Sequence, residues 1–115
     1  AFNDNFPNVS NFIGEFDFGL NGGGELVRLF DAEELPVDEV NYDDSSPWPL
    51  EPDGNGPTLE LIHPSLDNDL GVNWATSDNN GGTPGVVNSV YTADSSNSLV
   101  SGIVINEINY NSADE

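Results

Sequence analysis

Prolines and glycines interrupt this chain so often that they leave no room for a long helix, and every apolar run stays short. The stretch PWPLEPDGNGPTLELIHPSLDN (residues 47–68) places prolines on both sides of Trp48, then a turn, then a short apolar run that ends at Pro64. Proline fixes φ and removes a backbone donor, and glycine supplies the positive φ of turns. This punctuation predicts short strands joined by tight turns.

Four segments have the residue pattern of β-strands: residues 24–31, 36–43, 57–63 and 101–111. In the second, Asp38, Val40 and Tyr42 fall on one face, and the fourth is rich in β-branched residues. Residues 32–36 have the length of a hairpin turn, so we expect the first two strands to pair antiparallel. Short strands at this spacing, separated by Gly, Pro and Asn, predict an all-β fold of the sandwich type.

The two ends of the chain differ from this central part. Five of the six phenylalanines precede residue 20 without a clean period, which predicts a short helical turn or loop that packs its rings onto the sandwich. Residues 92–102 are polar and serine-rich, as flexible linkers are. We therefore divide the chain into a body (1–91), a linker (92–102) and a final strand segment (103–115).

Charge excludes several classes of partner. The 115 residues hold 21 acidic side chains and one Lys or Arg, Arg28, for a formal net charge of −20. Contact with nucleic acid or with anionic lipid requires basic groups, so neither is an expected partner. The longest apolar stretch, around LVSGIVI, is too short to cross a bilayer. Cations, neutral polysaccharide or a second copy of such a domain fit this surface better.

The residue inventory also bears on location. The chain has no cysteine, so neither disulfide bonds nor thiol chemistry is available to it. Abundant Asp and Asn without lysine fit a salty or calcium-containing fluid, in which screening relieves self-repulsion. The sequence opens directly into mature-looking residues, and we expect a piece of a longer secreted or cell-surface protein.

Catalytic chemistry has little support. A nucleophile with a general base would need His63, the single histidine, which ends a predicted strand and precedes Pro64. That position favours a surface or capping role, and no nucleophile elbow precedes a helix. We expect no enzymatic activity; a hydrolase would require an activity that His63→Ala abolishes.

Loop acids and amides are the candidate metal ligands. Asp67, Asn68 and Asp69 offer carboxylate and amide oxygens, as do residues 77–82 and the pair Asp43-Asp44. Ca²⁺ takes about six to eight such oxygens on flexible loops. The spacing does not match an EF-hand. The other interpretation, which we favour for each loop because Asn and Asp commonly take this role, is that these side chains form Asx turns, in which they accept hydrogen bonds from the nearby backbone.

The two tryptophans and the single arginine also have expected roles. Trp48 and Trp74 are expected to close the core, because an indole buries a large area; the alternative for Trp48 is an exposed platform that stacks on a sugar ring. Arg28 should be neutralised by nearby carboxylates, and a contact with Glu107 in the last strand is one hypothesis.

An ordered set of motifs over residues 20–89 resembles the lamin-tail domain of nuclear lamins and many secreted bacterial proteins. The motifs are a glycine-rich turn before ELVRLFD, then VDEVNYDDSSPWP, DGNGPTLELIHPSLDN, NW at residues 73–74 and GGTPG at residues 81–85. The resemblance implies an immunoglobulin-like β-sandwich with a role in association. Fold alone does not fix function.

The C-terminal stretch GIVINEINYNSADE (residues 102–115) resembles the opening strand of such a domain. The chain would then hold the later part of one unit and the first strand of the next. The family's EFIEL-type run and Trp-bearing strand have no counterpart, so the sandwich is incomplete or completed by strand exchange. The last strand either folds back on its own body or pairs with another molecule, and we favour pairing, because unpaired strand edges are templates for association.

These observations predict a non-enzymatic structural or interaction module of a secreted or cell-surface, multidomain bacterial protein. The expected partners are other domains of the same protein or another copy of the chain. The alternative is a calcium-stabilised carbohydrate-binding or adhesin module, in which Asp67, Asn68 and Asp69 hold Ca²⁺ and Trp48 contacts polysaccharide.

Overall fold

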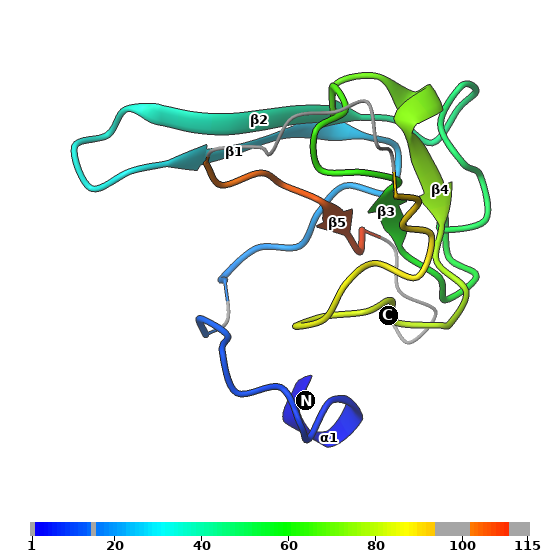
Figure 1. Ribbon diagram of the computed structural model, residues 1–115, viewed down its shortest axis with the longest axis horizontal. Helices are drawn as coiled ribbons and strands as arrows, with labels where there is room; N and C mark the ends of the chain where they lie inside the picture. Colours follow the sequence, from blue (N-terminus) through cyan, green and yellow to red (C-terminus); the bar gives the residue numbers. More distant parts are fainter. Residues whose placement is uncertain (1, 15, 94–101, 111–115) are drawn as a thin grey trace.

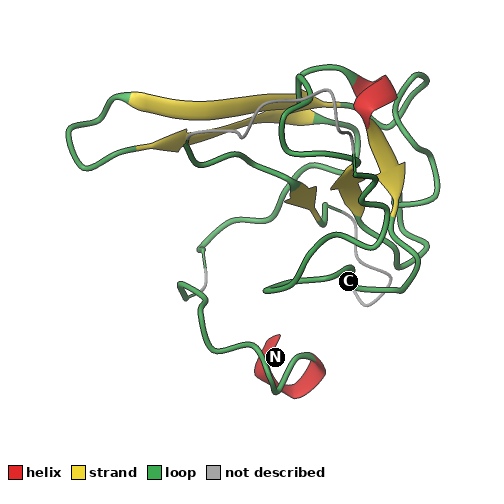
Figure 2. Ribbon diagram, in the orientation of Figure 1, coloured by secondary structure: helices red, strands yellow, loops and turns green. Residues whose placement is uncertain are grey.

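The computed structural model describes residues 2–14, 16–93 and 102–110. Strands form two antiparallel sheets, and helix is limited within these residues to two short turns, α1 (Phe2–Asn5) and the 3₁₀ turn η1 (Gly71–Asn73) (Figure 2). The predicted all-β class is confirmed at this level. No described helix is long and apolar enough to cross a membrane.

A two-stranded ribbon, β1 (Glu25–Phe30) and β2 (Pro36–Tyr42), projects from the rest of the molecule (Figure 1). The expected hairpin is confirmed. Its turn is held by Asp31, whose Oδ1 accepts the N–H groups of Glu33 and Leu35 at 3.0 and 2.8 Å. On β2 the predicted face is also correct, because Val40 and Tyr42 are buried and Asp38 is half-buried while their neighbours are exposed.

The second sheet has the order β4-β3-β5, with β3 (Leu59–Leu61) in the centre, β4 (Trp74–Thr76) on one side and β5 (Glu107–Ile108) on the other. All three residues of β3 are buried, including Glu60. A central strand covered on both faces has no exposed alternation. β4 was not among the predicted strands, because three residues are too few to establish a period.

The third and fourth predicted strands are shorter than the sequence indicated. β3 has three residues where residues 57–63 were expected, and β5 has two where residues 101–111 were expected. Beyond the ends of these two strands, backbone N–H groups donate to side-chain oxygens instead of to a neighbouring strand. The Thr58 N–H donates to Ser77 Oγ at 2.9 Å, and the Ile105 N–H donates to Asp38 Oδ2 at 2.7 Å.

Residues 102–110, called the terminal segment below, lie on the body of their own chain. β5 pairs with β3 in the register Leu59↔Ile108 and Glu60↔Glu107, which is the fold-back alternative. Pairing with another molecule, which we favoured, is a property of an assembly and stays a prediction. Most of the predicted linker (residues 94–101) and the last five residues (111–115) lie outside the described residues.

The buried core joins both sheets to the terminal segment. Two ring pairs dominate it: the Trp48 and Trp74 centroids lie 5.8 Å apart, and those of Tyr42 and Tyr110 lie 4.8 Å apart. Its members are Val40, Tyr42, Trp48, Leu59, Leu61, Trp74, Ile108 and Tyr110. Because two of these eight come from the terminal segment, that segment is part of the core and not an appendage.

The N-terminal phenylalanines only partly match the prediction. α1 supplies the expected helical turn, and Phe2 packs on Phe6 and Phe12 at centroid distances of 5.0 and 5.2 Å. Phe16 and Phe18 contact each other but remain mostly exposed. In Figure 1 the chain runs from α1 through an extended arm before it enters the body. None of these rings belongs to the buried core.

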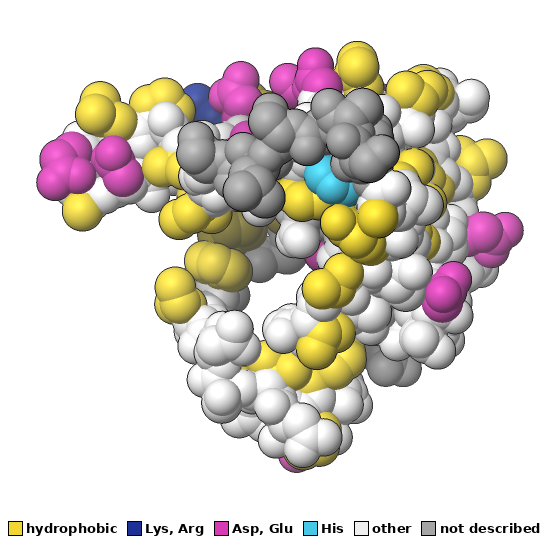
Figure 3. Space-filling view, in the orientation of Figure 1, with side chains coloured by type: hydrophobic (Ala, Val, Ile, Leu, Met, Phe, Trp, Pro, Cys, Tyr) yellow, Lys and Arg dark blue, Asp and Glu magenta, His cyan; other side chains and the backbone are white. Residues whose placement is uncertain are grey.

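Charged side chains are spread over the visible surface, and acidic groups gather at the tip of the ribbon (Figure 3), where Asp31, Glu33 and Glu34 are exposed. Arg28 lies on the outer face of β1 opposite Glu39, with its guanidinium carbon 5.6 Å from the centroid of the Phe30 ring. The hypothesised contact with Glu107 is not formed.

Candidate functional site

The terminal segment is held mainly through its backbone. Asp38 Oδ2 accepts the Ile105 N–H at 2.7 Å, and the amide of Asn68 donates to both Asp38 Oδ2 and the Ile105 carbonyl at 2.8 and 3.2 Å. One residue further, the Asn106 carbonyl accepts the Leu61 N–H at 2.8 Å. These contacts are made to main-chain atoms, so they would tolerate many different side chains at positions 105 and 106.

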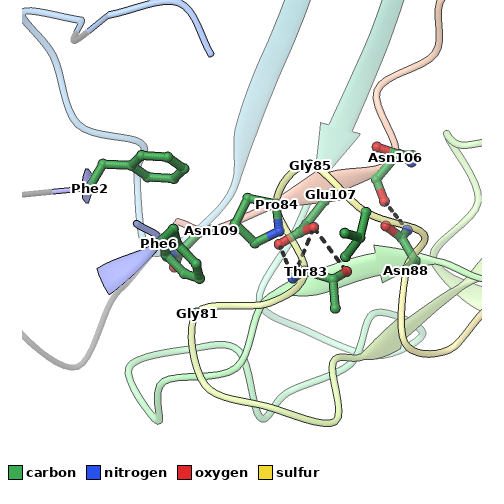
Figure 4. Close-up of a pocket in the computed structure, with 11 residues that line it drawn as sticks. Phe2, Phe6, Gly81, Thr83, Pro84, Gly85, Asn88, Asn106, Glu107 and Asn109 are labelled. Atoms are coloured by element: carbon green, nitrogen blue, oxygen red, sulfur yellow. Dashed lines mark hydrogen bonds between the residues drawn. The ribbon is translucent and has the colours of Figure 1, made fainter. Parts of the chain in front are cut away.

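Asn88 joins the segment to the central strand. Its Nδ2 donates to the carbonyls of Leu61 and Asn106 at 3.1 and 2.7 Å, so one buried amide bridges β3 and the terminal segment. Figure 4 shows the Asn88–Asn106 bond at one end of a cleft. A buried amide that satisfies two carbonyls is costly to remove, because each acceptor would be left without a partner.

Two side chains of the segment give it a register. Ile108 and Tyr110 are 4% and 3% exposed, and both enter the core. Burying one aliphatic side chain contributes about 1.5–3 kcal/mol. Since successive side chains of a strand alternate between faces, a slip by one residue would exchange these groups for the asparagines beside them.

Glu107 and Glu60 face each other across β5 and β3. Glu60 is fully buried, and its carboxylate accepts the hydroxyls of Thr83 and Ser89 at 2.5 and 2.6 Å and the Val90 N–H at 3.2 Å. Like charges directly opposite in a sheet are destabilising. This pair is therefore the most unusual feature of the site.

The Glu107 carboxylate has its own donors. Oε1 accepts the Thr83 N–H at 3.1 Å and the Thr58 hydroxyl at 3.2 Å (Figure 4). Burial is the main cause that raises the pKa of Glu107, and the charge of Glu60 acts in the same direction; the hydrogen bonds from Thr83 and Thr58 oppose them. The net shift is upward, toward the protonated form.

Gly82 allows the loop to close over this pair. Its φ is +71°, and a Cβ at this position would overlap the Glu107 carboxylate and the Thr58 hydroxyl. Glycine alone adopts that backbone conformation without strain and leaves that space free. The GGTPG motif at residues 81–85 thus brings Thr83 to both carboxylates.

Two open clefts flank residues 85–88. The first, of about 380 Å³, is lined by Phe2, Phe6, Pro84 and Glu107 among others, so Glu107 borders a space open to solvent (Figure 4). The second, of about 560 Å³, lies between Tyr91 and Val87 and is largely apolar. Glu60 lines neither cleft.

Tyr110 ends the described part of the segment with an unusual polar atom. Its hydroxyl is buried and is the one buried side-chain polar atom of the described residues that lacks a hydrogen-bond partner. Burial, followed by the charges of Asp53, Asp44 and Asp43, raises the pKa of Tyr110 to about 12. The phenol is therefore neutral at physiological pH.

Each of the three predicted metal ligands has a hydrogen-bond partner within the chain. Asp67 Oδ1 accepts the Asp69 N–H at 3.1 Å, which is the Asx turn given as the alternative. Asp69 Oδ1 accepts the Asn41 N–H at 3.2 Å, and the Asn68 side chain binds Asp38 and the terminal segment. Each of the three thus has a structural role, and no group of three or more His, Cys, Asp or Glu side chains within the described residues is arranged to hold a metal.

Asp43 likewise forms an Asx turn. Its Oδ1 accepts both the N–H and the hydroxyl of Ser45, and these bonds lower the pKa of Asp43.

Trp48 closes the core, as the sequence predicted. It is 8% exposed, it packs on Trp74, and a Cβ on Gly71 would approach its ring within 3.0 Å. Trp74 is also buried, and its Nε1 donates to the Asn68 carbonyl at 2.8 Å. Neither indole offers the exposed face that stacking on a sugar requires.

His63 takes part in a local turn. The Ser65 N–H and hydroxyl both lie at its Nδ1, at 3.1 and 2.7 Å, and its ring stacks on Tyr91 at a centroid distance of 5.3 Å. Because Nδ1 accepts the Ser65 N–H, its lone pair is already engaged. Within the described residues no carboxylate orients the imidazole, so the geometry matches the capping role.

The residues that hold the terminal segment were not identified from the sequence. Asp38, Glu60, Thr83 and Asn88 come from four separate places in the chain, and no motif in the sequence indicates that they meet the terminal segment. The available signal was a charged residue within an apolar run, Glu60 in LEL and Glu107 in INEI.

Comparison with models of protein families, with curated proteins and with solved structures finds no significant match for this chain.

Proposed function

We propose that this chain is a non-enzymatic structural and interaction module of a secreted or cell-surface multidomain protein, and that it associates by adding its terminal segment to a sheet. The supporting observation is that the segment is held as an added strand, through backbone contacts with Asp38, Leu61 and Asn88. Strand addition is a common mode of recognition, in which main-chain hydrogen bonds give affinity and side-chain pockets give specificity.

The contacts that hold the segment do not depend on its covalent link to the body. Ile105 meets a side chain 67 positions away, and Asn106 meets one 18 positions away. A second copy of the chain presents the same nine residues, and a neighbouring domain with a similar strand would present an equivalent backbone. Exchange of an identical element between protomers is a low-cost route to association.

We also infer that the two sheets belong to an immunoglobulin-like sandwich of the lamin-tail type. The ordered motifs over residues 20–89 and the antiparallel pairing of all strands support this inference. The projecting ribbon β1-β2 is consistent with a sheet that further strands complete, because an isolated two-stranded hairpin is marginally stable. The lysine-free, acidic composition supports an extracellular location.

The mass of the full chain in solution tests strand exchange. We expect light scattering coupled to size-exclusion chromatography to find a monomer–dimer equilibrium that moves toward dimer with concentration. Ile108→Asp should abolish the dimer, because the side chain enters the core. Leu50→Asp, at a 57% exposed position outside the site, should leave it unchanged. A strict monomer at every concentration would overturn exchange between copies.

Mixing two variants tests whether a loss of dimer is caused by misfolding of the variant rather than by loss of strand exchange. Ile108→Asp damages the donated segment, and Asn88→Ala damages the acceptor, so neither should dimerise alone. In a mixture, the intact terminal segment of the Asn88→Ala variant can dock on the intact body of the Ile108→Asp variant. We therefore expect a heterodimer. Failure of the mixture to associate, with both variants folded by circular dichroism, would contradict the proposal.

A further inference from the structure

The buried carboxylate of Glu60 and the half-buried carboxylate of Glu107 share a single hydroxyl, that of Thr83. Thr83 Oγ1 lies 2.5 Å from Glu60 Oε1 and 3.4 Å from Glu107 Oε2. A hydroxyl has one hydrogen to donate. We propose that Glu60, Thr83 and Glu107 form a proton-binding latch, in which the carboxylate pair holds one proton while the terminal segment is docked and the segment is released when that proton is lost. This inference rests on the proposed function and concerns its regulation.

The count of hydrogen-bond donors places the proton on Glu107, because Glu60 accepts from three donors and Glu107 from two, the Thr83 N–H and the Thr58 hydroxyl. The short contact assigns the Thr83 hydrogen to Glu60, which also accepts from Ser89 and Val90. The Thr83 oxygen can then only accept toward Glu107. Its approach to Glu107 Oε2 becomes attractive when that carboxyl carries a hydrogen, and the chain Glu107–Thr83–Glu60 is then hydrogen-bonded throughout with one negative charge.

No Lys or Arg side chain neutralises the pair within the described residues. Arg28, the only Arg or Lys in the chain, lies on the ribbon over the Phe30 ring and forms no ion pair with either carboxylate. The neighbouring segments carry acids and no Lys or Arg: Asp78 precedes Thr83 in the same loop, and Asp4 lies on α1, whose Phe2 lines the same cleft as Glu107. Two ionised carboxylates here would repel in a site that excludes water on the Glu60 side.

The two carboxyl groups differ in their access to solvent, and the proposed latch requires this difference. Glu60 is fully buried, whereas Glu107 is half-buried and borders the open cleft (Figure 4). The proton can therefore exchange with solvent at Glu107 without opening the core. Glu107 also belongs to the segment that leaves, so its release separates the two charges.

The direction of the pH dependence follows from the two states of Glu107. In the docked state burial raises its pKa above the ordinary value of 4.5, and in the released segment the pKa returns to that value. The docked state therefore binds more protons. Docking is strongest below pH 4.5 and weakens as the pH rises through the raised pKa.

Hydrogen exchange of two amides in the full chain reports docking directly. The Ile105 N–H and the Leu61 N–H are bonded only while the segment is in place, to Asp38 and to Asn106. After correction for intrinsic exchange, we expect their protection to fall between acid and alkaline pH. The fall should be about tenfold for each unit by which the pKa of Glu107 is raised.

Glu107→Gln tests the assignment, because its amide donates a hydrogen to Thr83 at every pH. We expect strong protection that no longer depends on pH. Glu51→Gln is the matched control: it removes one negative charge at an exposed position and should keep the wild-type pH dependence. This control separates the latch from the general relief of self-repulsion on acidification.

The outcomes distinguish the latch from the proposed function. Protected amides with the same pH dependence in wild type and Glu107→Gln would overturn the latch alone. Amides that are unprotected at every pH in both proteins would show that the segment does not dock, which overturns the mode of association as well.

Discussion

Single residues decide how closely the loop at residues 81–85 approaches the carboxylate pair. Buried polar groups must find partners within the protein, because water is excluded from them. Here the partners of Glu60 are hydroxyls and one N–H from residues 83–90, which can reach it only if the chain passes very near. Gly82 permits that approach, because it has neither a Cβ nor a barrier to positive φ.

We therefore expect Gly82→Ala to destabilise the protein. The new Cβ would meet the Glu107 carboxylate, and a non-glycine residue in this backbone conformation costs about 1–3 kcal/mol before any displacement is counted. Urea unfolding measures the loss. Gly19→Ala is the control, because nothing lies within 4 Å of its Cβ position, and it should change the free energy of unfolding by less than about 0.5 kcal/mol. Equal effects of the two substitutions would contradict the close approach.

At the scale of elements, the ribbon β1-β2 has one face on the core and one toward solvent. Val40 and Tyr42 are buried, whereas Leu26, Phe30 and Val37 are at least 40% exposed. The alternation was readable from the sequence because the side-chain period of a strand is two. Which of the two faces meets the core could be predicted from the sequence only for β2, because its charged and apolar residues fall on different faces near Val40 and Tyr42.

This asymmetry predicts unequal effects of two alanine substitutions. Val40→Ala should cost about 2 kcal/mol of stability, because it removes two buried methyl groups and leaves a cavity. Leu26→Ala removes a larger side chain from the exposed face and should cost less. Thermal unfolding of the two variants compares them, and a larger loss for Leu26→Ala would mean that the outer face is covered in solution.

The whole molecule combines a small core with a net charge of −20. Self-repulsion of this size opposes the compact state, and salt relieves it by screening. The acids are distributed over the visible face (Figure 3). Of the predicted calcium ligands, Asp67 and Asp69 accept backbone N–H groups and the Asn68 amide donates to Asp38. Cations should therefore stabilise the protein by screening the repulsion among its acidic side chains, and not by binding at one loop.

We expect the melting temperature to rise with salt and to rise equally with CaCl₂ and MgCl₂ at the same ionic strength. The reason is that Asp67, Asn68 and Asp69 point toward separate partners. Differential scanning calorimetry makes the comparison, with Asp67→Asn as the control. A rise specific to calcium that Asp67→Asn removes would instead support the metal site predicted from the sequence.

What the sequence determined by itself is local. Proline and glycine spacing predicted short strands, and the alternation in residues 36–43 predicted which face is buried. The short connection at residues 32–36 predicted a hairpin, and the loop acids Asp67 and Asp43 predicted Asx turns. Each of these features depends on neighbours a few residues apart. The tertiary structure alone decided that Glu60 meets Glu107, that Asn88 bridges β3 to the terminal segment, and that Asp38 binds Ile105. These groups are 18 to 67 positions apart, and no local pattern encodes a contact whose energy arises only when burial removes water from both partners.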